Sequence, residues 1–409
     1  MRLKAFVLVV ALAAATAAFA QDARAALAQA GDPRVDSLLR VADSVRSPGQ
    51  GRGPDSALVR LRLAVALEPS ARVHAAIADA FVGIYSARRT ERAAYDSALA
   101  HADEALRADP GNTRARFNKG LAHALAGERS AALAEYERVL ALDSTHARVA
   151  PLLITEYYDA GRTREALALG ERTQALQPRN HQAQFRLGWA YGYLWEQEKA
   201  AEIFRRLASD STSGIYRAWG HGELAYLSRA RGDFADAVRH MEQAVRAVPS
   251  DRISQLGLAT MLLTAGDAAR ARPLIERALA GDSNATGYGA IPGRLLLGWA
   301  ARDLGDSALA HDMLREVERR ILTSVVPGND QRPMLLKVYA LQGRRADAVA
   351  LLEQLSGLSL DNLYGGPDDH DGTLASLRDV PEFQAFRSKL RERVMARRGA
   401  MDLPSLPES

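Results

Sequence analysis

The sequence predicts an all-α protein: a solenoid of about eight helix pairs, followed by a C-terminal capping segment. The 409-residue chain is longer than one compact core usually allows, which favours several domains or an elongated repeat. Alanine and leucine dominate its apolar residues and β-branched runs are few, a balance that favours helix over sheet. A helical pattern of small and bulky residues also recurs from about residue 55 to 356.

The N-terminus predicts a secretory signal peptide over residues 1–20. Arg2 and Lys4 supply positive charge, a short apolar stretch follows, and Ala18-Phe19-Ala20 fits the small-x-small pattern that precedes cleavage. The apolar stretch is short for a spanning helix, which needs about 20 apolar residues. We therefore expect cleavage near Ala20 and a bacterial protein that is periplasmic or secreted, with no membrane insertion after cleavage. Retention of the leader as an inner-membrane anchor is the alternative.

The charge balance and the lack of cysteine exclude several functions. The chain has 53 Lys and Arg residues against 49 Asp and Glu residues, so no basic excess supports binding to nucleic acid. It contains no cysteine, which rules out disulfides, thiolate metal sites and a cysteine nucleophile. Stability must therefore come from packing.

Each repeat is predicted to contain two helices joined by a turn. An alanine is followed by a residue four positions later, usually bulky, and by a small or apolar residue three positions after that, so all three share one helix face. Four successive alanines are spaced by 34 residues, and longer intervals separate the others. The pattern begins at Ala57, Ala98, Ala132, Ala166, Ala200, Ala237, Ala271, Ala310 and Ala348.

Glycine and proline mark the two turns of the repeat. A glycine usually precedes the alanine by five residues, where the left-handed conformation would end the first helix. These glycines are Gly127, Gly161, Gly232, Gly266, Gly305 and Gly343. Several units then close with a proline, such as Pro110 and Pro178.

These units resemble tetratricopeptide repeats. In the segment Phe185–Tyr191, Gly188 fills the small position and Tyr191 the tyrosine position of that family, and Ala200 and Phe204 follow in register. Trp195 stands where the turn glycine is expected. The resemblance implies a right-handed α-solenoid over residues 33–356, in which small residues let paired helices approach and bulky residues fill the space between units.

Two parts of the chain depart from the repeat. Residues 47–55 are expected to form a flexible loop, and residues 281–293 and 323–333 lengthen later turns. Beyond the last unit, an apolar helical face resembles a short tail that often follows tetratricopeptide arrays. We expect residues 357–398 to cap the open end of the solenoid and residues 399–409 to be disordered.

The sequence gives little support for catalysis, a cofactor or a metal. It lacks GxSxG, HExxH and the phosphate-binding glycine loop. His101 and Glu104 share a helix face, but no further metal ligands lie near them, so we interpret them as a surface pair. His123 is interpreted as a core histidine. The acidic run at residues 368–371 lacks the spacing of known calcium loops and is interpreted as a solvated turn, with binding of a hard cation as the alternative.

The resemblance also implies where a ligand would bind. In tetratricopeptide arrays the first helix of each pair lines a concave groove. Matching positions here carry aromatic residues and arginines, the residue types most enriched at binding hot spots. They are Phe117, Tyr158, Phe185, Trp189, Tyr193, Trp219, Tyr226 and Trp299, with Arg114, Arg148, Arg186, Arg229 and Arg302 on or beside the same face. The alternative is that several of these side chains only pack between units.

The function expected from these features is that of a non-catalytic scaffold. It would bind a peptide or protein partner in the groove, in the cell envelope. A carbohydrate- or cell-wall-binding protein that uses the same aromatic residues as stacking platforms is the first alternative. A metal-dependent enzyme that uses the loop at residues 365–372 is the second.

Overall fold

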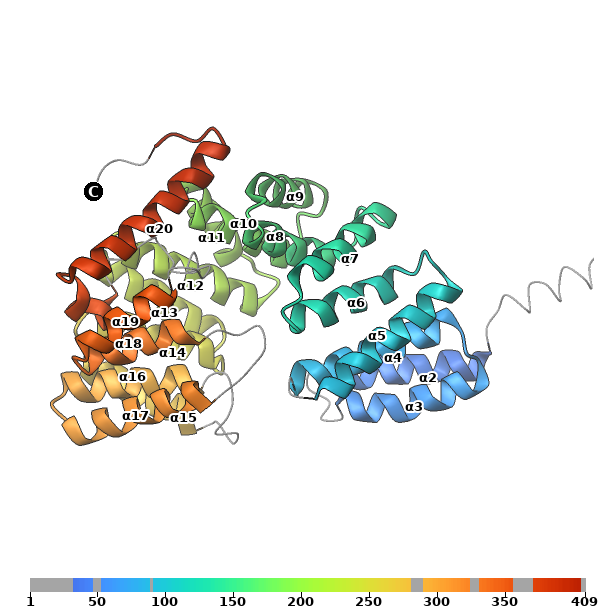
Figure 1. Ribbon diagram of the computed structural model, residues 1–409, viewed down its shortest axis with the longest axis horizontal. Coiled ribbons are helices and arrows are strands. Elements are labelled where there is room, and N and C mark those ends of the chain that lie inside the picture. Colours follow the sequence, from blue (N-terminus) through green and yellow to red (C-terminus); the bar gives the residue numbers. More distant parts are fainter. Residues whose placement is uncertain are drawn as a thin grey trace, which may run out of the picture. The chain divides into compact units, whose positions relative to one another are not determined.

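The computed structural model describes residues 32–46, 53–88, 91–280, 290–323, 331–355 and 371–405. Within these ranges the chain is helical and contains no strand, which confirms the predicted all-α solenoid of helix pairs. The chain divides into two units, Met1–Ser144 and Thr145–Ser409 (Figure 1). The helices in these ranges are all too short or too polar to cross a membrane. The predicted signal peptide, residues 1–20, lies outside the described residues.

The first unit contains three helix pairs around one core. Each pair packs against the next, and the first helix α4 also contacts the first helix α6. Buried alanines, together with Tyr85 and Tyr95, fill the space between the pairs. The helices are α2 (Pro33–Arg46), α3 (Pro54–Leu67), α4 (Ala71–Ala87), α5 (Arg92–Ala108), α6 (Thr113–Leu125) and α7 (Arg129–Leu142).

The second unit continues the same alternation. The first helix of one pair contacts the first helix of the next, as α8 does with α10 and α12 does with α14. Its pairs are α8 (Val149–Asp159) and α9 (Thr163–Leu176), α10 (His181–Tyr193) and α11 (Gln197–Ala208), α12 (Gly214–Ala230) and α13 (Phe234–Ala247), α14 (Arg252–Thr264) and α15 (Ala268–Ala280), α16 (Ala290–Asp303) and α17 (Ser307–Thr323), and α18 (Arg332–Leu341) and α19 (Arg345–Leu355). A 3₁₀ helix, η2 (Gly372–Leu377), and α20 (Pro381–Ala400) follow.

The small positions allow the close helix approach that the repeat pattern predicts. A Cβ atom on Gly188 would lie 2.6 Å from the Phe204 ring, and one on Gly120 would lie 2.7 Å from the Tyr136 ring. Both aromatic rings are fully buried. The glycine of each first helix is thus the space into which the bulky residue of the second helix fits.

The turns within the pairs confirm the role expected of glycine. All six predicted turn glycines have positive φ, between 70° and 82°. Trp195 adopts the same left-handed conformation with a φ of 58°. The Glu196 N–H then donates to the Tyr191 carbonyl at 3.0 Å, as the Asp233 N–H does to the Ser228 carbonyl after Gly232. The turn geometry is therefore kept in the unit that lacks the glycine.

The expected loops are shorter than predicted. Pro54 and Asp55 form the first turn of α3, so only residues 47–52 of the predicted loop 47–55 lie outside the described residues. Helix α16 begins at Ala290 and α18 at Arg332, inside the predicted insertions 281–293 and 323–333. Proline at the start of α3 and α18 suits the first turn of a helix, because the ring fixes a helical φ and the missing N–H needs no partner there.

The C-terminal segment does more than cover one end. Helix α20 contacts α19, and its far end reaches the turn between α10 and α11, as Figure 1 shows for the red helix. There the buried Arg398 guanidinium lies 2.8 Å from the Glu196 carboxylate and donates to the Leu194 carbonyl.

The expectation of a disordered tail at residues 399–409 is wrong for residues 399–405. Helix α20 continues to Ala400, and Met401 and Leu403 pack against the core of α8–α12. Arg398 Nε donates to the Pro404 carbonyl at 3.0 Å, which holds this segment in place. Sequence composition missed the packing because the contacting residues lie about two hundred positions away.

Candidate functional site

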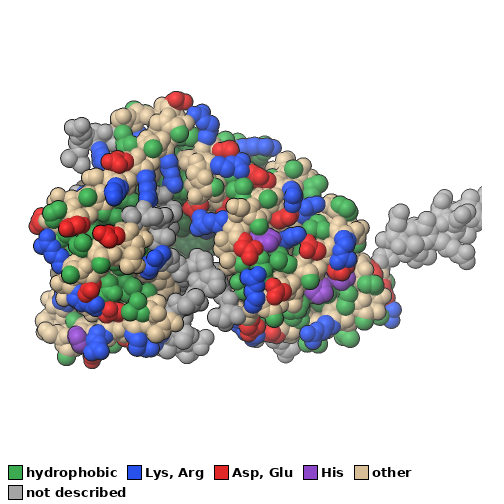
Figure 2. Space-filling view, in the orientation of Figure 1, with side chains coloured by type: hydrophobic (Ala, Val, Ile, Leu, Met, Phe, Trp, Pro, Cys, Tyr) green, Lys and Arg blue, Asp and Glu red, His purple; other side chains and the backbone are tan. Residues whose placement is uncertain are grey.

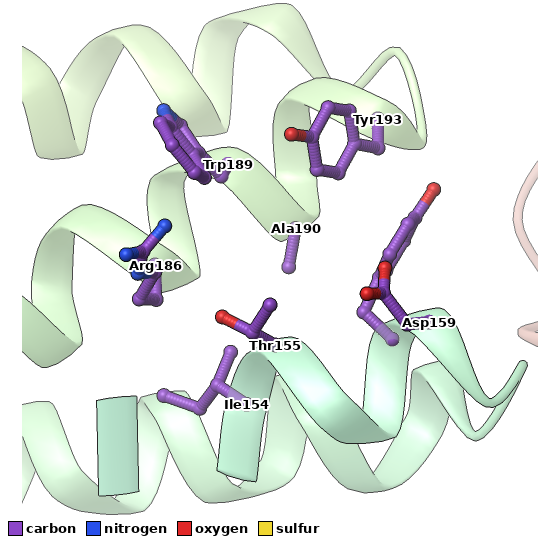
Figure 3. Close-up of a pocket in the computed structure, with 8 residues that line it drawn as sticks. Ile154, Thr155, Asp159, Arg186, Trp189, Ala190 and Tyr193 are labelled. Atoms are coloured by element: carbon purple, nitrogen blue, oxygen red, sulfur yellow. The ribbon is translucent and has the colours of Figure 1, made fainter. Parts of the chain in front are cut away.

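A cavity of about 300 Å³ lies between the first helices α8 and α10 of the second unit (Figure 3). The resemblance predicts ligand contacts on these first helices. The lining residues are Ile154, Thr155, Tyr158, Asp159, Arg186, Trp189, Ala190 and Tyr193. The cavity therefore brings together Tyr158, Trp189 and Tyr193 from the predicted aromatic set, and Arg186 beside them.

Helix periodicity places these side chains on one face. Arg186, Trp189 and Tyr193 are separated by three and four positions along α10, so they project in the same direction. Thr155 and Tyr158 are likewise three positions apart on α8. In Figure 3 the side chains of the two helices face each other across the cavity.

Aromatic rings form a continuous series along this face. The ring centroids of Tyr158 and Tyr193 are 4.9 Å apart, and those of Trp189 and Tyr193 are 6.3 Å apart. Phe185 joins Trp189 at 4.9 Å to Trp219 of α12 at 5.0 Å. Trp189, Tyr193 and Trp219 are half-buried, whereas Phe185 and Tyr158 are buried. The series thus has a packed base and a partly exposed surface.

Two arginines and one carboxylate give the cavity its polar groups. The Arg186 guanidinium lies 4.5 Å from the centre of the Trp189 ring, and the Arg397 guanidinium of α20 lies 4.6 Å from that of Tyr158. Asp159 adds a carboxylate at the end of α8. Burial, and secondarily the charge of Glu223, raises the pKa of Tyr193, so its hydroxyl stays protonated at neutral pH. Arg397 was missed by sequence reasoning, because only the fold brings α20 to α8.

Three other predicted residues meet the C-terminal segment in place of solvent. Trp299 is only 3% exposed, and Arg229 is buried. The position that a Cβ on Gly372 would occupy is 2.6 Å from the Trp299 indole, so Gly372 lies against that ring. Tyr226 is half-buried, and its pKa is raised chiefly by burial and further by Glu223 and Asp371.

The remaining predicted residues lie elsewhere. In the first unit, Phe117 is buried against Tyr136 with ring centroids 6.2 Å apart, and Arg114 lies 2.8 Å from Asp43. In the second unit, Arg148 is exposed and precedes α8. Arg302 lies 2.7 Å from Asp303. Phe117 therefore contributes to the core and offers no surface to a ligand, and Arg114, Arg148 and Arg302 do not line the cavity between α8 and α10.

A second, more polar cavity of about 560 Å³ lies among helices α16 to α18 and the turn that follows α18. Arg302 and Arg344 line it, and each of them pairs with an acidic residue. Lys and Arg are interspersed with Asp and Glu over the face seen in Figure 2. Neither feature forms a surface of one charge.

The described residues also bear on the expected lack of metal chemistry. Within them, no group of three or more His, Asp or Glu side chains is arranged to hold a metal ion. Of the acidic run at residues 368–371, only Asp371 is described, and its carboxylate accepts from Lys337 and Thr373. His101 stacks on His74, and Glu104 pairs with Arg107.

The sequence and the fold match known proteins. The family model "Tetratricopeptide repeat" matches residues 85–147, 152–214 and 223–286. The human IFIT1 dimer with m7Gppp-AAAA is 15% identical and has a TM-score of 0.50, over 88% of this chain and 76% of that chain. A tetratricopeptide repeat protein from Parabacteroides merdae is 20% identical with a TM-score of 0.47, over 64% of this chain and 97% of that chain. No curated protein matches the sequence. The chain is therefore an all-α solenoid built of tetratricopeptide repeats.

Proposed function

We propose that this protein is a non-catalytic scaffold that binds a peptide or protein partner through the first helices of its second unit. Tetratricopeptide repeats in general serve protein–protein interaction. The observation that carries the proposal is the partly exposed aromatic cavity between α8 and α10. Half-buried Trp and Tyr side chains next to an arginine are the composition typical of binding hot spots.

The chemistry of the cavity favours an apolar anchor residue of the partner. Ile154 and Ala190 contribute aliphatic surface, and Trp189 and Tyr193 contribute ring faces. A volume of about 300 Å³ is at the small end of ligand pockets and suits one large side chain. Asp159 and the Tyr193 hydroxyl can bond to the backbone on either side of that anchor. We therefore propose a peptide that presents a Phe, Tyr, Trp or Leu side chain here.

Binding experiments on purified protein test the proposal. Peptides selected from a random library against the full chain should bind at least tenfold more weakly to Trp189→Ala, because a central aromatic contact is commonly worth more than 1.4 kcal/mol. Phe234→Ala is the matched control, since Phe234 is a half-buried aromatic residue on the second helix α13. Equal affinity of both variants and of the wild type would exclude the cavity as the binding site.

The same protein distinguishes a carbohydrate ligand from a peptide. Oligosaccharides and soluble peptidoglycan fragments are titrated in parallel with the selected peptides. Binding of a sugar that Trp189→Ala abolishes, with no selected peptide bound, would replace the peptide proposal with the carbohydrate alternative.

We also propose that the scaffold acts in the cell envelope of a bacterium. The support is the leader-like sequence at residues 1–20, with its charged start, apolar stretch and Ala18-Phe19-Ala20 pattern. Mass spectrometry of the protein isolated from the periplasm or medium should give a mature N-terminus at Gln21. Recovery only from the cytoplasm with the leader intact would refute this location.

A further inference from the structure

Residues 371–377 occupy part of the surface on which a groove ligand is expected. They follow the last repeat and contact the first helix α18, and Ser376 donates to the Ala340 carbonyl at the end of that helix at 2.8 Å. Gly372 lies against Trp299 of α16. The predicted groove residue Trp299 is thus covered by the chain itself.

Asp371 is held by cations from two first helices. Its Oδ2 lies 2.8 Å from Lys337 Nζ on α18, and its side chain is 13% exposed. Burial alone would raise the pKa of Asp371, but the charges of Lys337 and of Arg229 on α12 outweigh it and hold that pKa well below its usual range. A carboxylate held this way is a specific anchor, because an uncharged side chain would leave two buried or half-buried cations without it.

The residues after Asp371 add a defined shape to this anchor. Oδ1 of Asp371 accepts from the Thr373 N–H at 3.0 Å and from the Thr373 hydroxyl, which starts the 3₁₀ helix. Leu374 and Leu377 are buried in the core shared with α16 and α18. The position after the aspartate admits only glycine, since any Cβ there would lie 2.6 Å from the indole of Trp299.

We propose that Lys337, Arg229 and Trp299 form a recognition site for an acidic peptide that contains Asp-Gly, and that residues 371–377 occupy this site in cis. The partner is a protein segment with an aspartate, a glycine, a hydroxyl residue and a leucine in succession. It competes with the chain's own segment, which lowers the apparent affinity in proportion to the fraction of sites already filled. This site is separate from the cavity between α8 and α10, so Trp189→Ala leaves its peptide binding unchanged.

Fluorescence anisotropy with a labelled peptide of sequence Asp-Gly-Thr-Leu-Ala-Ser-Leu tests the site. The Asp371→Asn full-length variant should bind this peptide at least tenfold more tightly than the wild type, because its own segment has lost the charge that holds it. Asp379→Asn, at an exposed aspartate nearby, is the matched control and should bind as the wild type does. Replacing the peptide glycine by alanine, or adding Lys337→Gln to Asp371→Asn, should remove the gain.

Hydrogen exchange on the wild-type protein gives a second readout that needs no variant. Excess peptide should accelerate exchange in residues 371–377, whereas the alanine-substituted peptide should not. The proposal is overturned if the peptide leaves this exchange unchanged in the wild type. It is also overturned if a folded Asp371→Asn variant binds the glycine and alanine peptides equally, or binds neither.

Discussion

The closest helix contact in the second unit predicts opposite effects for two neighbouring glycines. A Cβ atom on Gly220 of α12 would lie 2.4 Å from the Ala208 backbone nitrogen and 2.7 Å from the Phe204 carbonyl oxygen. These are backbone atoms of α11, so no side-chain rotation relieves the clash. A Cβ atom on Gly222, two residues along the same helix, would meet nothing within 4 Å. Gly220→Ala should therefore push α11 and α12 apart, whereas Gly222→Ala should not.

The expected free energies follow from this geometry. Replacing glycine by alanine in a helix interior gains about 1 kcal/mol of intrinsic helix stability at either site. At Gly220 the forced separation of two backbones costs about 3 kcal/mol, the upper end of the range for overpacking. The net change is a loss of about 2 kcal/mol for Gly220→Ala and a gain of about 1 kcal/mol for Gly222→Ala. The two variants should thus differ by roughly 3 kcal/mol, more than a hundredfold in the unfolding equilibrium.

Urea unfolding followed by circular dichroism measures this difference. The midpoint should fall for Gly220→Ala and rise for Gly222→Ala, with the slope of free energy against urea unchanged. Equal midpoints, or a higher midpoint for Gly220→Ala, would show that α11 and α12 do not approach as closely as described.

Three further changes test other contacts. Arg398→Met removes the buried guanidinium that pairs with Glu196, so the protein should lose about 3 kcal/mol and α20 should be cleaved faster by protease; an unchanged cleavage rate would contradict this. Ala132→Asp places an unpaired charge in the fully buried core of the first unit and should cost about 4 kcal/mol in thermal unfolding, and a loss below about 1 kcal/mol would refute the packing at this position. Burial lowers the pKa of both His221 and His240, whose Nδ1 atoms are 3.2 Å apart. The unfolded chain therefore binds more protons than the folded chain just below the ordinary value of 6.5, so the melting temperature should fall from pH 7 to pH 5, and less steeply in His240→Gln; parallel curves would exclude this pair as a cause.

The repeat register was predictable from sequence because it depends on local spacing. Alanines separated by 34 residues and glycines five positions earlier specify the helix faces and the turn, and the positive φ at Gly127 and Gly343 agrees with that pattern. Trp195 broke the expected glycine pattern, yet it takes the same left-handed conformation. The hydrogen bonds that its neighbours make define that turn, together with the side chain.

Exposure of the candidate site residues was not predictable, because it depends on distant segments. Spacing placed Trp189 and Trp299 on equivalent faces of first helices. Trp299 is nevertheless covered by Gly372, and the cavity around Tyr158 receives Arg397 from α20. Neither contact leaves a trace in the repeat pattern, since both come from residues beyond the last repeat.

The contact of Arg398 with the turn between α10 and α11 changes how the second unit should respond to stress. In a simple repeat array each unit interacts with its neighbours only, so the ends fray first and the stability is a sum of local contributions. Here a bond across 204 residues ties the end of the chain to an early repeat. Fraying from the C-terminal side must therefore break this link before the last helices can separate. We expect the repeats between α10 and α19 to unfold cooperatively and to refold slowly, because that long loop closes late.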